Sequence, residues 1–309
     1  MEVPLDVPEL VRQRALSNGS RGRRWLTELA GVVADLAGRW GLELGRSLQG
    51  GTASFVVEAT DASGRDCVLK VAMHLDTDPE DSFDRSVLVH RLAAGEGCAL
   101  LLDCDEPARA MLLERLGPNL DELGMPLPQM LETIAGTLQR FWRPVADGCG
   151  LPTGPEKAAW LAGVVTTTWE LLDKPCPRPV VDRAVAYCEA RAAAFDPSRA
   201  VLVHGDAHGW NTLTDREGGF KFVDPEGLRS ERAHDLGVPM REYNLPLLAG
   251  GTARLVRDRA EHLAGWCAVD PDAVWQWGFI ERVSTGLANL RDFDGDDGMA
   301  FLEVARRCL

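Results

Sequence analysis

The spacing of apolar residues changes once along this chain of 309 residues, at Gly117-Pro118-Asn119. Before this point the pattern is typical of short strands and turns, and after it apolar residues mostly recur at helical spacing. An antiparallel sheet followed by a mostly helical part is an α+β architecture. Because the chain is also too long for one small core, we expect two lobes, residues 1–117 and residues 118–309.

The elements that we expect follow from these local patterns. Before the break they are a helical leader at about 8–40, strands at 55–57, 67–72, 99–102 and 110–113, and one inserted helix at 79–94. After it they are helices at about 128–143, 156–173, 179–194, 251–267, 271–291 and 297–307, with short strands at 200–203, 211–214 and 220–223.

The formal net charge of −14 makes nucleic acid an unfavourable main partner, because phosphates repel an acidic surface. No apolar run approaches the roughly 20 residues that a membrane span needs, and the first residues contain no secretory signal. The eight cysteines form no CxxC pair and no zinc-ligand spacing, so we expect buried free thiols. These features predict a soluble, cytoplasmic protein and leave its oligomeric state open.

The most informative stretch is Val201-Leu-Val-His-Gly-Asp-Ala-His-Gly-Trp-Asn211. An apolar strand leads into His204, Asp206 and Asn211, and the next strand leads into Asp224, thirteen residues after Asn211. Phosphoryl transfer needs one carboxylate to orient the attacking hydroxyl, and an amide oxygen with a second carboxylate to bind Mg²⁺. Any one of these residues alone would be an ordinary turn residue, but the set at this spacing favours a phosphotransfer site.

The form HGDxHxxN at 204–211, followed by Asp224-Pro-Glu-Gly227, resembles the aminoglycoside phosphotransferases, in particular their streptomycin-kinase and hydroxyurea-phosphotransferase branch. Residues 111–116 and 233–237 are also similar to that branch. The resemblance covers about residues 45–295. It implies a two-lobed protein-kinase-like fold, a Mg²⁺ ion, and ATP or GTP as the phosphoryl donor.

The resemblance also implies roles for residues of the second lobe. These roles are catalytic carboxylate for Asp206, magnesium ligands for Asn211 and Asp224, a brace behind the loop for His204, contact with metal or substrate for Glu226, and support of the loop backbone for Asp235.

In the first lobe, Lys70 lies inside an apolar strand, where an unpaired lysine is costly. A bond to the nucleotide phosphates would explain its position. Ser54 is the expected phosphate contact, although its loop Gly50-Gly-Thr-Ala-Ser54 is neither a GxGxxG nor a Walker A motif.

Two further contacts of the first lobe follow from the resemblance. Asp84 is the expected partner of Lys70 on the next helix, in competition with Glu80 and Asp81. Backbone groups from Glu114 to Leu116 would bind the adenine edge of the nucleotide.

The acceptor side is expected on the helix at 271–291 and the loop that follows it. Glu281 on this helix would contact the substrate. The segment Asp292–Asp297 contains four aspartates, which would either attract a cationic acceptor or form a solvated turn. Trp210 in the catalytic loop would pack on the substrate or in the core.

The first functional hypothesis is an antibiotic kinase that phosphorylates a hydroxyl of a small cationic molecule of the aminoglycoside type. The same residues would serve a metabolic kinase for an amino sugar or a small amino alcohol. A third hypothesis, a catalytically inactive kinase-like binding protein, is disfavoured because Lys70, Asp206, Asn211 and Asp224 are all present. A protein kinase is disfavoured because no activation loop ending in Ala-Pro-Glu follows Asp224.

Overall fold

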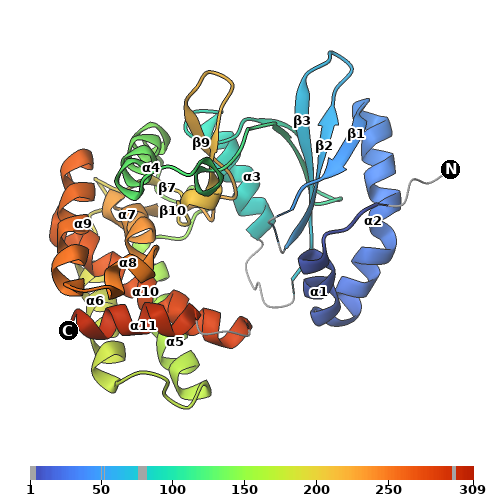
Figure 1. Cartoon of the computed structure of the whole chain (residues 1–309). Helices are drawn as coiled ribbons and strands as arrows, with labels where there is room; N and C mark the ends of the chain where they lie inside the picture. The colour runs from blue at the N-terminus through green and yellow to red at the C-terminus, as the bar shows by residue number, and fades with distance from the viewer. Residues whose placement is uncertain (1–4, 50, 52, 76–81, 294–296) are drawn as a thin grey trace. The chain divides into compact units, whose positions relative to one another are not determined.

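The computed structural model describes residues 5–49, 51, 53–75, 82–293 and 297–309. The chain forms two compact units, Met1–Gly117 and Pro118–Leu309 (Figure 1). The antiparallel sheet of the first unit and the many helices of the second confirm the predicted α+β class.

Two helices precede the sheet of the first unit, α1 (Glu9–Ser17) and α2 (Gly19–Trp40). The second helix ends at Gly41, whose φ of 62° is the left-handed conformation that favours glycine after a helix. Leu29 and Leu36 on one face of α2 are buried against the sheet. The amphipathic spacing of the leader therefore attaches it to one side of the sheet (Figure 1).

The sheet of the first unit is antiparallel throughout and has the strand order β1-β2-β3-β5-β4. Its strands are β1 (Glu43–Ser47), β2 (Ser54–Thr60), β3 (Asp66–Ala72), β4 (Leu101–Asp105) and β5 (Ala110–Glu114). Phe55 and Leu69 lie on the side that α2 covers. On the other side Met111 packs against Phe83 and Val87 of α3 (Ser82–Ala93).

Helices dominate the second unit. They are α4 (Leu127–Phe141), α5 (Gly154–Leu171), α6 (Arg178–Ala193), α7 (Arg232–Arg241), α8 (Asn244–Leu248), α9 (Thr252–Cys267), α10 (Pro271–Asp292) and α11 (Asp297–Arg307). Helix α10 packs against α5, α6, α7, α9 and α11, and so forms the centre of this unit. Within the described ranges, no helix combines the length and the apolar character that a membrane crossing requires.

Short strands and two 3₁₀ turns position the loops of the second unit. They are β6 (Arg143–Pro144), β7 (Val201–Val203), β10 (Leu228–Ser230), the hairpin strands β8 (Thr212–Thr214) and β9 (Phe220–Phe222), and the turns η1 (Leu120–Leu123) and η2 (Gly209–Asn211). The central strand β7 pairs antiparallel with both β10 and β6.

The sequence patterns missed α7 and β10. Every residue of α7 from Ala233 to Met240 is buried, so its apolar residues have no helical period, and the helix also contains Pro239. Strand β10 has only three residues, which is too short for a recognisable alternation. Both elements are stabilised by tertiary packing rather than by local pattern.

Candidate active site

The catalytic loop begins where β7 ends, and its backbone is held by one buried carboxylate. Asp235 of α7 accepts hydrogen bonds at Oδ2 from the backbone N–H of His204 (2.9 Å) and the indole N–H of Trp142 (2.7 Å). Its Oδ1 accepts the backbone N–H of Gly205 (2.7 Å). Burial raises the pKa of Asp235, and the three N–H donors oppose that shift.

His204 braces the loop from behind as a neutral imidazole. Its Nδ1 accepts the backbone N–H of Asp206 (3.2 Å), so the ring proton must be on Nε2, which donates to the carbonyl of Val223 (3.0 Å). Complete burial lowers the pKa of His204 to about 4. The ring also packs against Phe141 and Phe222.

Gly205 is required between His204 and Asp206 for two reasons. Its φ of 84° is unfavourable for other residues, and a Cβ there would lie 3.0 Å from the Cβ of Glu226. The His-Gly-Asp motif therefore includes a glycine because the chain turns sharply against the loop that carries Glu226.

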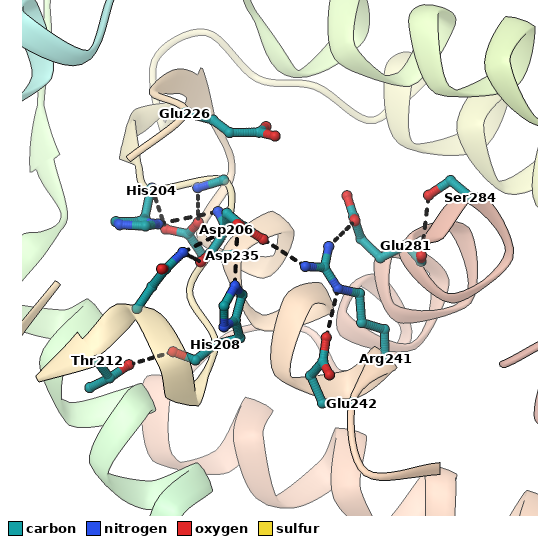
Figure 2. Close-up of polar contacts among 12 residues, drawn as sticks. His204, Asp206, His208, Thr212, Glu226, Asp235, Arg241, Glu242, Glu281 and Ser284 are labelled. Atoms are coloured by element: carbon teal, nitrogen blue, oxygen red, sulfur yellow. Dashed lines mark hydrogen bonds and ion pairs between the residues drawn. The ribbon is translucent and has the colours of Figure 1, made fainter. Parts of the chain in front are cut away.

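Three side chains donate to or lie close to the carboxylate of Asp206 (Figure 2). Arg241 Nη2 donates to Oδ1 (2.6 Å), Asn211 Nδ2 donates to Oδ2 (3.2 Å), and His208 Nε2 lies 3.3 Å from Oδ2. Burial alone would raise the pKa of Asp206, but Arg241 and His208 outweigh it and hold this pKa well below its usual range. Asp206 is therefore an ionised acceptor that can orient a hydroxyl.

Asn211 and Asp224 lie on neighbouring backbone segments. The N–H of Val223 donates to the carbonyl of Asn211 (3.0 Å), and the next residue is Asp224, with a φ of 56° and an exposed side chain. Because the amide nitrogen of Asn211 faces Asp206, its side-chain oxygen is the atom left to bind a cation.

This donor set suits Mg²⁺. An amide oxygen and a carboxylate are hard ligands, and phosphate and water oxygens usually complete such a site. Across the described ranges, no group of three or more His, Cys, Asp or Glu residues is arranged to hold a metal by itself.

A second ion pair lies beside Asp206. Lys157 of α5 donates to Oε2 of Glu226 (2.8 Å), and its Nζ lies 4.5 Å from the ring centre of Trp160. Burial lowers the pKa of Lys157, but the charges of Glu226, Glu281 and Asp206 outweigh this and raise it. The lysine is therefore a fixed cation in this carboxylate-rich region.

The comparisons with known proteins agree with this geometry. The profile of the aminoglycoside/hydroxyurea antibiotic resistance kinases matches residues 39–292. The chain belongs to this family. Two curated relatives are a hydroxyurea phosphotransferase of Kitasatospora aureofaciens, 28% identical over 99% of this chain and 84% of its own length, and a streptomycin 6-kinase of Streptomyces griseus, 27% identical over 93% and 92%.

The fold of this kinase is also found in more distant phosphotransferases. A solved structure of a spectinomycin phosphotransferase with ADP and spectinomycin has a TM-score of 0.51 and 14% identity, over 89% of this chain and 92% of its own. The predicted protein-kinase-like fold is thereby confirmed.

Two residues that we expected on the acceptor side of the kinase occupy different environments. Glu281 has only 5% of its side chain exposed and accepts from Arg241 (2.9 Å), and its contact with an acceptor stays a prediction. Trp210 is 59% exposed in η2, so the alternative of a core role is wrong.

The acidic segment after α10 is described only at its ends. Asp292 pairs with its neighbour Arg291 (2.7 Å), and Asp297 is exposed in the first turn of α11. Asp294 and Asp296 lie outside the described residues.

In the first unit, Ser54 and Lys70 occupy the same face of the sheet. Val56 pairs with Lys70 and Ser54 with Ala72, and the alternation of β2 and β3 places all four on the side opposite the α2-covered face. The structure therefore brings the two expected phosphate contacts onto one face.

The other expected residues of the first unit are scattered. Asp84, the expected partner of Lys70, is exposed in the first turn of α3, whose sheet-facing positions are taken by Phe83 and Val87, so the inward orientation that this pairing requires is not the one observed. Glu114 Oε1 accepts the N–H of Leu100 (2.7 Å) at the end of β5, and Leu116 is half-buried. Gly50, Thr52, Glu80 and Asp81 lie outside the described residues.

Sequence reasoning missed Arg241 and Lys157. Neither is part of the motif, and their partners lie 35 residues away for Arg241 and 69 for Lys157. His208 could have been predicted from the sequence as a neighbour of the Asp206 carboxylate, because it lies only two residues after Asp206 in the same loop.

Proposed function

We propose that this kinase transfers a phosphoryl group from ATP, with GTP as an alternative donor, to a hydroxyl of a small cationic acceptor. The observation that carries the proposal is the Asp206 carboxylate, which Arg241 holds ionised and to which Asn211 donates a hydrogen bond. Asp224 directly follows Val223, whose backbone N–H bonds to the carbonyl of Asn211. Asp206 accepts a hydrogen bond from the acceptor hydroxyl and receives its proton as the hydroxyl oxygen bonds to the γ-phosphorus and the bond from that phosphorus to the departing nucleoside diphosphate breaks.

Mg²⁺, when bound, neutralises phosphate charge and orients the phosphates. Asn211 and Asp224 are the residues that would hold it, and His204 and Asp235 keep their loop in place. In the first unit we propose that Lys70 and Ser54 contact phosphates and that the backbone at Glu114–Leu116 contacts the base.

The charge around Asp206 supports a cationic acceptor. The side chains joined by ion pairs there are four carboxylates and two cations; they are Asp206, Glu226, Glu242 and Glu281, with Lys157 and Arg241, while the nearby Arg259 and Arg282 donate to backbone carbonyls instead. A net negative region attracts amines and guanidinium groups. With the streptomycin 6-kinase among its relatives, an aminoglycoside-type antibiotic is the acceptor that we propose first.

A panel of acceptors tests the proposal. ADP release is measured with Mg-ATP or Mg-GTP and with streptomycin, other aminoglycosides, hydroxyurea, amino sugars or small amino alcohols. We expect acceptor-dependent turnover with a cationic antibiotic, and a preference for an amino sugar or amino alcohol would favour the metabolic alternative.

The matched control is Asp206→Asn. It should lower kcat by about 10²-fold or more, with nearly unchanged Mg-nucleotide affinity, because Asp206 contacts the acceptor rather than the nucleotide. Absence of acceptor-dependent ADP release, or equal turnover of the Asp206→Asn variant, would overturn the proposal.

A further inference from the structure

Helix α7 is held on α10 in one register by two glycines. A Cβ on Gly237 would lie 2.8 Å from the Cβ of Trp277, and a Cβ on Gly278 would lie 2.6 Å from the Cβ of Met240. Contacts this close leave no room for any larger residue, so the two helices cannot slide past each other. This register places Arg241, at the end of α7, beside Glu281 of α10.

The chain at the end of α7 is fixed by two buried arginines. Arg259 donates to the carbonyls of Glu242 (2.7 Å) and Met240 (3.3 Å). Arg282 donates to the carbonyl of Arg241 (3.1 Å) and also to that of Met240. These bonds satisfy the last carbonyls of the helix, which have no partner within it, and they hold the backbone of Arg241 in place.

The side chain of Arg241 is then bound on three sides (Figure 2). Nη2 donates to Asp206 (2.6 Å), Nη1 to Glu281 (2.9 Å) and Nε to Glu242 (3.0 Å). Only 12% of this side chain is exposed. A planar guanidinium that is bonded at three nitrogens has no free rotation, which is the property needed to hold a partner in one orientation.

We propose that Arg241 is the positioning residue of Asp206, and that Glu281 and Glu242 act through it by fixing its guanidinium. This inference rests on the proposed function of Asp206 as acceptor of the substrate hydroxyl. Helix α7 then supports the catalytic loop at two points. Asp235 accepts hydrogen bonds from the loop backbone, and Arg241 donates to the side chain of Asp206. Glu281 thereby contributes to the geometry of the site through its bond with Arg241.

The test separates positioning from stability. Arg241→Met removes the guanidinium and leaves Glu281 as a buried charge without its arginine partner, with His234 Nε2 at 3.8 Å, so it should lower both the melting temperature and kcat. The double variant Arg241→Met, Glu281→Gln removes that buried charge. It should regain most of the melting temperature but keep a kcat about 10²-fold below the unmodified kinase, since misplacement of a reacting group by about 1 Å has an effect of this size.

Two further variants complete the test. Arg241→Lys keeps the charge, but one ammonium cannot hold three carboxylates in a plane, so kcat should fall by about 10-fold with an unchanged Mg-nucleotide Kd. Arg191→Met is the matched control, because Arg191 is similarly buried (11% exposed) and paired with Glu231, and it should leave kcat unchanged.

A background variant identifies the partner through which Arg241 acts. When the double variant Arg241→Met, Glu281→Gln is introduced into the Asp206→Asn protein, kcat should fall by less than about 3-fold relative to Asp206→Asn alone. The reason is that substitutions of residues that act as a unit do not have additive effects. Wild-type kcat in the double variant, or a full additional loss in the Asp206→Asn background, would overturn the inference. Absence of acceptor-dependent turnover in the unmodified kinase would instead overturn the proposed function, and the inference with it.

Discussion

The replacement Asp235→Asn is the sharpest test of how the catalytic loop is held. The native carboxylate accepts N–H groups from His204, Gly205 and Trp142, and every one of these donors is buried. An asparagine keeps the size of the side chain but has only one acceptor oxygen. If that oxygen accepts the N–H groups of His204 and Trp142, which bind Oδ2 in the native protein, the new NH₂ group must face the N–H of Gly205.

The magnitude follows from these three bonds. Leaving the buried Gly205 N–H unpaired costs about 1–3 kcal/mol, and two charge-assisted bonds become neutral ones, each weaker by about 1 kcal/mol. Because burial raises the pKa of Asp235, the neutral amide recovers part of the desolvation cost, so we take the lower end of the sum, about 3 kcal/mol. For a unit of the size of residues 118–309, this corresponds to a fall of about 6–12 °C in Tm.

Calorimetry and amide hydrogen exchange measure this effect. The amides of His204 and Gly205 should exchange much faster in the variant, because their acceptor is weakened. The matched control is Asp215→Asn. Asp215 accepts the N–H groups of Glu217 (2.9 Å) and Gly219 (2.7 Å) in the β8–β9 turn, where water can replace a lost bond, and we expect a change below about 1 kcal/mol.

A Tm within about 2 °C of the unmodified protein, with unchanged exchange at these two amides, would refute the reasoning. It would mean that the loop backbone does not depend on Asp235.

The remaining predictions concern the metal, the phosphates, acid stability and salt. Asp224→Ala should weaken Mg-nucleotide binding together with turnover, and unchanged affinity by calorimetry would contradict the metal assignment. Lys70→Ala should lower kcat/KM for the nucleotide, measured against the acceptor's own KM as control. The pKa of Glu281 is lowered to about 2: burial raises it, but His234, Arg241 and Lys157 outweigh burial. Its contribution, about 2–4 kcal/mol of unfolding free energy, is therefore present above pH about 4.5 and lost as pH falls towards 2. Glu281→Gln should be less stable at pH 7 and lose less between those pH values, as followed by denaturant titration. KM for a cationic acceptor should rise with ionic strength, because salt screens an acidic site, and a salt-independent KM would contradict this.

The sequence by itself was sufficient to predict the phosphotransfer motif. Asp206, Asn211 and Asp224 follow two short strands, and the links between them are local: the N–H of Val223 bonds to Asn211, and His204 bonds to the carbonyl of Val223. Because the spacing along the chain determines these contacts, the arrangement could be predicted without the rest of the fold. The helices with an exposed polar face and the strands of the first unit were predictable for a similar reason, because the spacing of their apolar residues reflects burial on one side.

The tertiary structure decided the surroundings of that motif. Whether Glu281 and Trp210 are buried and whether Asp84 faces the sheet all depend on which side of an element packs against another. Spacing within one element does not contain that information.

The same holds for Arg241, which lies at the end of a helix with no visible period because it is buried on all sides. Its bonds to Asp206 and Glu281 join residues 35 and 40 positions apart. They exist because Gly237 and Gly278 let α7 and α10 approach closely, and close packing of two helices is a property of the folded unit rather than of either segment.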